Sequence, residues 1–281
     1  MDSQRKHART FSFEFYPPKT PEGKARLRTT WQQLAQLKPR FFSVTFGAGG
    51  STQQGTLDTV LEIRESGHEA APHLSCVASS KAEIASILGH YKDNGIRHIV
   101  ALRGDLPSGV AMAGELRHAN ELVTFIRETT GDWFNIEVAS YPEYHPQTRN
   151  AADEVKNFKR KIDAGANAAM TQYFYTADAY FRVVDDCEAA GISVPIVPGI
   201  MPIGNFSQLA RFSDACGAEI PRWMRIKLDG YRDDTASIRS FGLDVVTALC
   251  DKLLSAGAPG LHFYTLNQAG QVTTIWQRLG L

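Results

Sequence analysis

The chain has 281 residues, with 30 basic and 30 acidic side chains and a pI of about 7.1. This balance excludes a general affinity for nucleic acid or anionic membranes, and no apolar run is long enough to span a bilayer. The N-terminus lacks the apolar centre of a signal peptide, and the four cysteines have no metal or redox spacing, so we expect a reduced, cytoplasmic protein.

Strand-like and helix-like segments alternate along the chain after a polar stretch, residues 1–10, that we expect to be a flexible tail. Phe11–Tyr16 alternates aromatic with small or charged residues and stops at two prolines, which is typical of a strand. Thr20 followed by Pro21 predicts the start of a helix that runs to about Leu37. The pattern then predicts, in order, a strand at 41–46, a helix at 53–67, a strand at 70–77, a helix at 81–94, a strand at 96–103, a helix at 116–130, a strand at 134–139, a helix at 151–164, a strand at 168–174, a helix at 177–190, a strand at 195–200, helices at 205–215 and 232–256, a strand at 260–266 and a short final helix.

Eight strands separated by helices in a chain of this length predict a parallel (β/α)8 TIM barrel. We find no linker, repeat or low-complexity stretch, so we expect one catalytic domain over residues 11–281. An open doubly wound sheet is the alternative. It fits less well because no Gly-x-Gly-x-x-Gly follows the first strand, and Gly47-Ala48-Gly49-Gly50 after the second has different spacing.

Polar residues gather where the expected strands end, which is where barrels of this kind place their chemistry. Arg103-Gly104-Asp105 closes a buried strand, and two opposite charges there are costly unless they form a pair that holds a turn or serve a site. The other polar residues near strand ends are Glu14, Thr45, His73, Tyr141, Glu143, His145, Gln172, Tyr264 and Thr265. These residues are scattered in the sequence, but they would meet at one rim of the barrel. We therefore expect a functional site at that rim.

Several of these residues also have a purely structural interpretation. Glu14, between Phe13 and Phe15, could be a buried carboxylate paired with a lysine or arginine, although the apolar setting also suits a general acid. His73 and His262 could be hydrogen-bonded core histidines, and Tyr141 and His145 could be turn residues. The basic cluster Lys156, Lys159, Arg160 and Lys161 is expected to be mostly a solvated helix face, from which one lysine could reach a phosphate.

The sequence shows no pattern for a metal or for a catalytic nucleophile. There is no His-x-x-x-His spacing, no Cys/His cluster and no Gly-x-Ser-x-Gly motif. A barrel with a buried glutamate and a rim of hydrogen-bonding groups therefore predicts that a cofactor carries the chemistry.

Several segments, taken together and in order, resemble the methylenetetrahydrofolate reductase family over about residues 11–280. They are Phe11–Pro18, Phe42–Gly47, Ala70–Cys76, Gly95–Pro107, Ala139–Pro146, Lys159–Ala166 with Thr171-Gln172, Pro198–Pro202 and His262–Asn267. The resemblance implies a (β/α)8 barrel that holds FAD at the strand ends. It implies that NADH or NADPH and then 5,10-methylenetetrahydrofolate use one shared site in a ping-pong hydride transfer that yields 5-methyltetrahydrofolate. It also implies a cytoplasmic flavoprotein of one-carbon metabolism and methionine biosynthesis that forms a homo-oligomer.

Matching the motifs residue by residue assigns roles to named side chains. Glu14 resembles the general acid that opens the folate five-membered ring, and Asp105 resembles the carboxylate beside both flavin and pterin. The residues matched to the folate substrate are Glu14, Asp105, Gln172, Gln208, Phe212 and Gln268. Those matched to FAD are Thr45, His73, Arg103, Gly104, Asp105, Tyr141, His145, Glu154 and Lys161. Arg103 and Lys161 would neutralise the pyrophosphate.

The chain departs from the family at Gln268, where bacterial relatives carry an arginine that would meet the carboxylates of the folate tail. We therefore expect either that the tail contributes less to binding or that another cation, such as Arg278 or Arg232, replaces it. Three rival functions remain open at this point. They are a flavin-free reductase that passes hydride from NADH directly to folate, a folate-binding barrel without turnover, and a folate-dependent demethylase.

Overall fold

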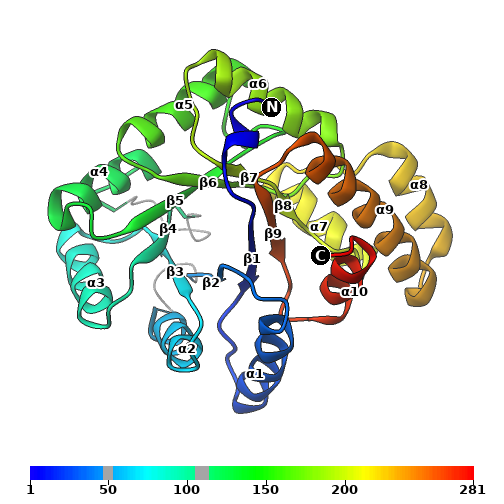
Figure 1. Ribbon diagram of the computed structural model, residues 1–281, viewed down its shortest axis with the longest axis horizontal. Coiled ribbons are helices and arrows are strands. Elements are labelled where there is room, and N and C mark those ends of the chain that lie inside the picture. The colour runs from blue at the N-terminus through cyan, green and yellow to red at the C-terminus, as the bar shows by residue number, and fades with distance from the viewer. Residues whose placement is uncertain (47–52, 105–113) are drawn as a thin grey trace.

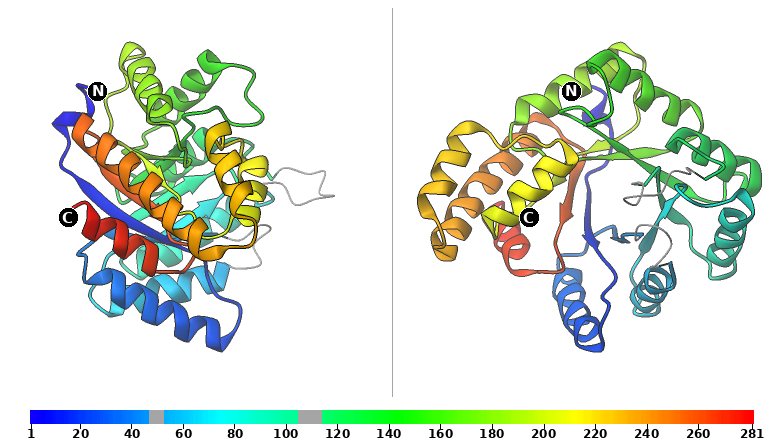
Figure 2. Two further views of the ribbon diagram at one scale, coloured as in Figure 1. Left: turned by 90° about the vertical axis from the view of Figure 1, so that its right-hand side faces the viewer. Right: turned by 180° about the vertical axis from the view of Figure 1, so that it is seen from behind.

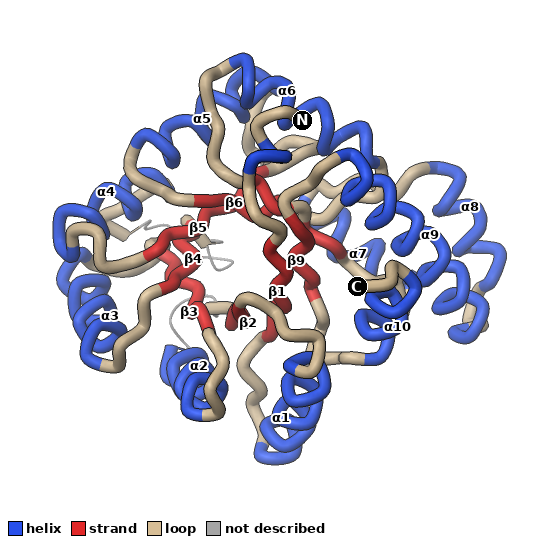
Figure 3. The backbone as a smooth tube through the Cα atoms, in the orientation of Figure 1, coloured by secondary structure: helices blue, strands red, loops and turns tan. Residues whose placement is uncertain are grey.

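Parallel strands form a ring at the centre of the fold, and helices surround it (Figure 1, Figure 3). The computed structural model describes residues 1–46, 53–104 and 114–281. Its strands are β1 (Thr10–Phe15), β2 (Phe41–Val44), β3 (Ala70–Ser75), β4 (His98–Leu102), β5 (Asn135–Ser140), β6 (Ala168–Thr171), β7 (Ile196–Val197), β8 (Gly199–Ile200) and β9 (Gly260–Tyr264). The alternation of strands and helices confirms the expected (β/α)8 barrel.

The ring closes at Pro198, which divides the strand expected at 195–200 into two short strands. Hydrogen-bonded neighbours follow the order β7-β6-β5-β4-β3-β2-β1-β9-β8. Proline has no N–H to donate, so the ladder is interrupted there. The chain pairs with β6 before Pro198 and with β9 after it. Together β7 and β8 therefore occupy one of eight places around the barrel.

The helices surround the ring in the order that the sequence predicts, with two additions, one before the first strand and one between the helices expected at 205–215 and 232–256. They are η1 (Gln4–Lys6, a 3-10 helix), α1 (Pro21–Ala35), α2 (Gln53–Glu65), α3 (Lys81–Asp93), α4 (Ala119–Thr130), α5 (Ala151–Asp163), α6 (Ala177–Ala189), α7 (Phe206–Cys216), α8 (Arg222–Tyr231), α9 (Thr235–Ala256) and α10 (Gly270–Arg278). At the start of α1, the Thr20 side chain accepts a hydrogen bond from the Gly23 N–H at 3.1 Å, as its place before Pro21 predicts. None of the helices that the structure describes has both the length and the apolar character needed to cross a membrane.

Helix α8 was not expected from the sequence. It buries only Met224 and Leu228, four residues apart, whereas Trp223 and Ile226 are more than half exposed. Two buried positions give only a weak helical pattern, so the sequence predicts no helix between α7 and α9.

The inner and outer faces of the barrel wall differ in character. The outer face packs large side chains such as Phe13 and Phe15 against the helices. The apolar cluster inside the ring is much smaller and consists of Phe41, Ala71, Val100 and Met170, with Leu102 packed against it. Polar side chains occupy much of the remaining interior, and they include the buried pair His98 and Glu137, whose Nε2 and Oε1 atoms lie 2.9 Å apart.

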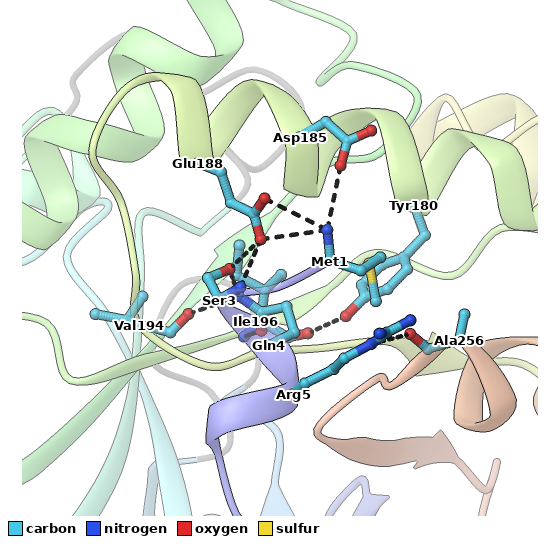
Figure 4. A network of polar contacts seen from close by, with 10 residues as sticks. All are labelled: Met1, Ser3, Gln4, Arg5, Tyr180, Asp185, Glu188, Val194, Ile196 and Ala256. Carbon is cyan, nitrogen blue, oxygen red and sulfur yellow. Dashed lines mark hydrogen bonds and ion pairs between the residues drawn. The ribbon is translucent and has the colours of Figure 1, made fainter.

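The first nine residues, which we expected to form a flexible tail, are ordered against α6 and β7 (Figure 4). The fully buried Gln4 side chain donates to the Val194 carbonyl at 3.2 Å and accepts from the Ile196 N–H at 2.8 Å. The terminal ammonium lies 3.3 Å from Asp185 and 3.2 Å from Glu188. These contacts are made with residues far along the chain, so no local pattern in the sequence indicates them. Both chain ends lie on the same side of the barrel in the left view of Figure 2.

Replacing Gln4 by alanine is expected to lower the free energy of unfolding by about 1–3 kcal/mol, because the Ile196 N–H would lose its buried acceptor. Lys6→Ala is the matched control, since Lys6 is exposed in the same turn. Guanidinium unfolding followed by circular dichroism measures both variants. Equal, small losses for the two would show that the segment adds little to stability.

Candidate functional site

A cavity of about 300 Å³ lies inside the barrel at the C-terminal ends of its strands. Glu14 comes from β1, Ser75 from the end of β3, and Tyr264 from the end of β9. The residues around this central cavity include Glu14, Thr45, His73, Gly104, Tyr141, Gln172 and Tyr264. The structure thus brings together six residues that the sequence matched to substrate or cofactor, along with Tyr264.

Glu14 of β1 lies between His262 of the neighbouring strand β9 and His73 of β3, which is two places away around the barrel. Its Oε2 atom is 3.3 Å from His73 Nε2 and 3.4 Å from His262 Nε2. The other ring nitrogen of His262 lies 2.7 Å from the Ser12 hydroxyl. A carboxylate only accepts hydrogen bonds, so with Glu14 ionised His262 donates to it from Nε2, and Nδ1 is left to accept from the Ser12 hydroxyl. His262 is therefore the hydrogen-bonded core histidine that we considered, and it also holds Glu14.

His73 differs from His262 in having no satisfied partner for Nε2. This buried atom has no hydrogen bond, because its 3.3 Å approach to Glu14 has the distance of an ion pair without hydrogen-bond geometry. Burial lowers the pKa of His73, and the opposing effect of Glu14 does not restore it. The ring is thus favoured as neutral imidazole, and Nε2 is an orphaned polar atom at a cavity, which a bound ligand could satisfy.

The wall beside Glu14, on the β9 side, is held in a fixed shape by contacts with the backbone. The Tyr264 hydroxyl donates to the Thr171 carbonyl at 2.7 Å, and burial raises the pKa of this hydroxyl well above its ordinary value. A Cβ at Gly199 would lie 2.1 Å from the same carbonyl, so only glycine allows this approach. Gln172 follows Thr171 directly, and its side chain lines the central cavity.

A second cavity, of about 340 Å³, adjoins the first. The two share Leu102, Gly104, Ala139 and Tyr141. The predicted residues that line the second cavity are Arg103, Gly104, Tyr141, His145, Glu154 and Lys161. Arg160 lines it as well, although we had interpreted that residue as part of a solvated helix face. We call this space the basic cavity, because three cations and one carboxylate lie among the described residues that line it.

Gly104 shapes the passage between the two cavities. Its φ of +84° is in the left-handed region, and a Cβ there would lie 1.9 Å from the Ser75 hydroxyl. The Ser75 hydroxyl in turn donates to the Arg103 carbonyl at 2.8 Å. The Arg103 side chain bonds to the Gln147 side-chain oxygen and to the Gly104 carbonyl. Asp105, the third member of this motif, lies outside the described residues.

Lys161 is buried in the wall of the basic cavity. Its ammonium donates to the Ala139 carbonyl at 2.5 Å, and burial lowers its pKa to about 8 although Glu154 favours the charged form. Glu154 is itself occupied, since it accepts from the His145 N–H at 3.2 Å and from the Thr148 hydroxyl at 2.7 Å. The cavity consequently keeps an excess of positive charge and would attract an anion such as a diphosphate.

A third, smaller cavity of about 90 Å³ lies on the other side of the central one, and Tyr264 lines both. It brings together the three remaining predicted residues, Gln208 and Phe212 of α7 and Gln268. Arg239 of α9 also lines it, and no pattern in the sequence pointed to that residue. The three cavities are thus linked in a series by shared lining residues, with Glu14 in the middle one.

Asn157 of α5 lines the basic cavity without having been predicted, although its spacing along the helix could have identified it. Glu154, Asn157 and Lys161 are separated by three and four residues, which places them on one helix face. No such local signal exists for Arg239, which reaches its cavity from a different helix. Within the described residues, no group of histidine, cysteine and acidic side chains is arranged to hold a metal ion.

Comparison with known proteins gives one consistent family. The family model described as Methylenetetrahydrofolate reductase matches residues 1–280. The 5,10-methylenetetrahydrofolate reductase of Escherichia coli (strain K12) is 42% identical over 271 residues, which cover 96% of this chain and 90% of the relative. Methylenetetrahydrofolate reductase (NADH) 1 of Zea mays is 38% identical, over 96% of this chain and 48% of that protein.

Solved structures share the fold at low sequence identity. An uncharacterised protein from Clostridium thermocellum that binds two copies of 5-methyl-5,6,7,8-tetrahydrofolic acid superposes with a TM-score of 0.68 and 14% identity, covering 98% of this chain and 95% of that one. At this identity the likeness concerns the barrel architecture alone.

Proposed function

This chain belongs to the methylenetetrahydrofolate reductase family and is an oxidoreductase, and we propose that it reduces 5,10-methylenetetrahydrofolate to 5-methyltetrahydrofolate with FAD as cofactor and NADH or NADPH as electron donor. The observation that carries the proposal is the series of three cavities. The Glu14 carboxyl group lies in the central one, cations predominate at one end, and neutral polar groups, an aromatic ring and Arg239 lie at the other.

The residues of the basic cavity fit the diphosphate half of FAD. Arg103, Arg160 and Lys161 outnumber Glu154, whose carboxylate already accepts two hydrogen bonds. Arginine binds phosphate oxygens through a planar fork of donors, and a buried lysine supplies a concentrated charge. When bound, FAD would supply hydride transfer between a nicotinamide and the folate.

In the central cavity, the chain's own residues would hold and protonate the substrate. Glu14, when its carboxyl group carries a proton, could give that proton to a folate nitrogen as the five-membered ring opens, and the contact with His262 keeps the carboxyl group in place. The Gln172 side chain, on the same cavity, would bind the pterin through its amide. Because the donor nicotinamide and the folate would use this one cavity, they would react in turn, as a ping-pong scheme requires.

The test is the visible spectrum of the purified protein under anaerobic conditions. We expect oxidised-flavin absorbance that bleaches with NADH and returns when 5,10-methylenetetrahydrofolate is added. Activity in a colourless protein to which FAD does not bind would favour the flavin-free reductase. A bleached spectrum that folate does not restore would leave the folate-reductase proposal unsupported.

The buried Lys161 predicts that the affinity of the protein for FAD depends on pH. Its pKa of about 8 means that the free protein loses this positive charge as the pH rises through that value. The affinity for FAD is therefore expected to fall above about pH 8 and to be steady below it. Lys161→Met should bind FAD at least about tenfold more weakly and should lose this pH dependence, since a charged phosphate contact contributes about 1.5–3 kcal/mol.

Titration of the apoprotein with FAD between pH 6 and 9.5, followed by tryptophan fluorescence, measures the effect. Lys156→Met is the matched control, because Lys156 is exposed on the same helix and does not line the cavity. The same pH profile in the Lys161→Met protein would remove Lys161 from the phosphate contact.

A further inference from the structure

Among the described residues that line the third cavity, only Arg239 of α9 is charged. All other described residues that line it are apolar or neutral, among them Phe212, Gln208 and Gln268. Arg239 is exposed and forms no hydrogen bond or ion pair with any described residue. A guanidinium at a cavity mouth without an acidic partner is free to bind an anion from outside the protein.

The two cations that the sequence offered as replacements for the missing arginine do not line this cavity. Arg278 is paired with Asp244, with Nη1 and Oδ1 2.7 Å apart. Arg232 follows the end of α8 and is not among the lining residues. Gln271 lines the cavity but donates its amide to the Ile203 carbonyl at 2.7 Å. Arg239 is thus the cation that the fold brings to the side of Gln268.

We propose that Arg239 binds the carboxylates of the folate glutamate tail, in place of the arginine that relatives carry at the position of Gln268. This inference rests on the proposed function, because it takes the bound molecule to be a folate. With its pterin beside Glu14 and Gln172, a folate would extend past Tyr264, which lines both cavities, toward Arg239. The guanidinium then meets a carboxylate that it can bind through two parallel hydrogen bonds.

In this arrangement an arginine still binds the glutamate tail, but the arginine belongs to a different element of the fold. The relatives' arginine would follow β9, whereas Arg239 comes from the first turns of α9. Because Arg239 is exposed, its pairing with the tail is screened by salt. Affinity for the tail should consequently be moderate at low ionic strength and should fall as salt is added.

The experiment compares two ligands that differ only in the tail, 5-methyltetrahydrofolate and 5-methyltetrahydropteroate, by calorimetric titration of the FAD-loaded protein at low salt. The wild-type protein is expected to prefer the folate, and Arg239→Gln should weaken folate binding about three- to tenfold. Binding of the pteroate should be unchanged in this variant. Arg239→Lys should keep part of the preference, and Arg239→Gln combined with Gln268→Arg should restore it.

Arg278→Gln is the matched control, because it makes the same chemical change at an arginine that is already paired. A preference for folate that survives Arg239→Gln, or that Arg278→Gln removes equally, would overturn the inference. Equal affinity of the wild-type protein for the two ligands would overturn it as well. Failure of the wild-type protein to bind either ligand would instead contradict the proposed function.

Discussion

Replacing Glu14 by glutamine is expected to slow the reduction of 5,10-methylenetetrahydrofolate by about 10²- to 10⁴-fold, which is the usual contribution of a general acid. Glutamine has nearly the same shape and can remain between His73 and His262, so the cavity should persist. It cannot supply a proton to the folate nitrogen. Oxidation of NADH with an artificial quinone acceptor needs no proton from this residue and should stay within about threefold of the wild-type rate.

The two activities are measured on the same preparations, with circular dichroism to confirm that the fold is kept. Glu128→Gln is the matched control, since Glu128 is an exposed carboxylate on α4 outside all three cavities. Loss of both activities to the same extent would mean that Glu14 shapes the cavity rather than protonating the substrate. A loss below about threefold in folate reduction would exclude it as the general acid.

Replacing His98 by leucine is expected to lower the free energy of unfolding by about 3–5 kcal/mol, because Glu137 would remain as a buried carboxylate without a partner. The two side chains are 10% and 7% exposed, and their Nε2 and Oε1 atoms are 2.9 Å apart. Chemical unfolding at pH 7 measures the loss. The double variant His98→Leu with Glu137→Leu should recover most of the loss, because it leaves no unpaired charge.

A matched surface pair provides the control for this prediction. Lys159 and Asp163 approach to 2.8 Å, but their side chains are 44% and 60% exposed. Lys159→Met should therefore cost less than about 0.5 kcal/mol. If Lys159→Met and His98→Leu lowered the free energy of unfolding by similar amounts, burial would not explain the effect of His98→Leu.

The same pair predicts the acid sensitivity of the fold. Burial would raise the pKa of Glu137, but the charge and hydrogen bond of His98 outweigh it and hold this pKa below the ordinary value of 4.5. A depressed carboxyl pKa adds stability above the unfolded value, and that stability is lost as pH falls through the folded value. The difference in unfolding free energy between the wild type and His98→Leu should consequently shrink as the pH falls below 4.5, the ordinary value.

The sequence predicted the elements of the barrel because their signals are local. Alternating residues marked β1, and Thr20 with Pro21 marked the start of α1. Signals that depend on distant partners were not available. The burial of Gln4 requires Val194 and Ile196, and the short apolar face of α8 gives little periodicity.

The candidate site was also predictable where its residues have a local signal in the sequence. Residues at strand ends, such as Glu14, His73 and Gln172, can be recognised from the barrel pattern, since parallel strands end on one rim. His73 shows the limit of this approach. Its sequence context allowed a satisfied core histidine, and only the packed structure shows that its Nε2 has no hydrogen-bond partner. Arg239 reaches its cavity through the packing of α9, which no local pattern encodes.

The anchoring of the chain's start has a consequence for synthesis on the ribosome. Gln4 bonds to Ile196, 192 residues later, and Thr265 bonds back to Glu14, 251 residues away. At about 5–20 residues per second, the first of these partners follows Gln4 by roughly 10–40 s. During that interval β1 has β2 on one side, and its other edge remains without β9. An unpaired strand edge favours wrong pairing between chains, so the nascent protein is expected to depend on chaperones until β9 emerges.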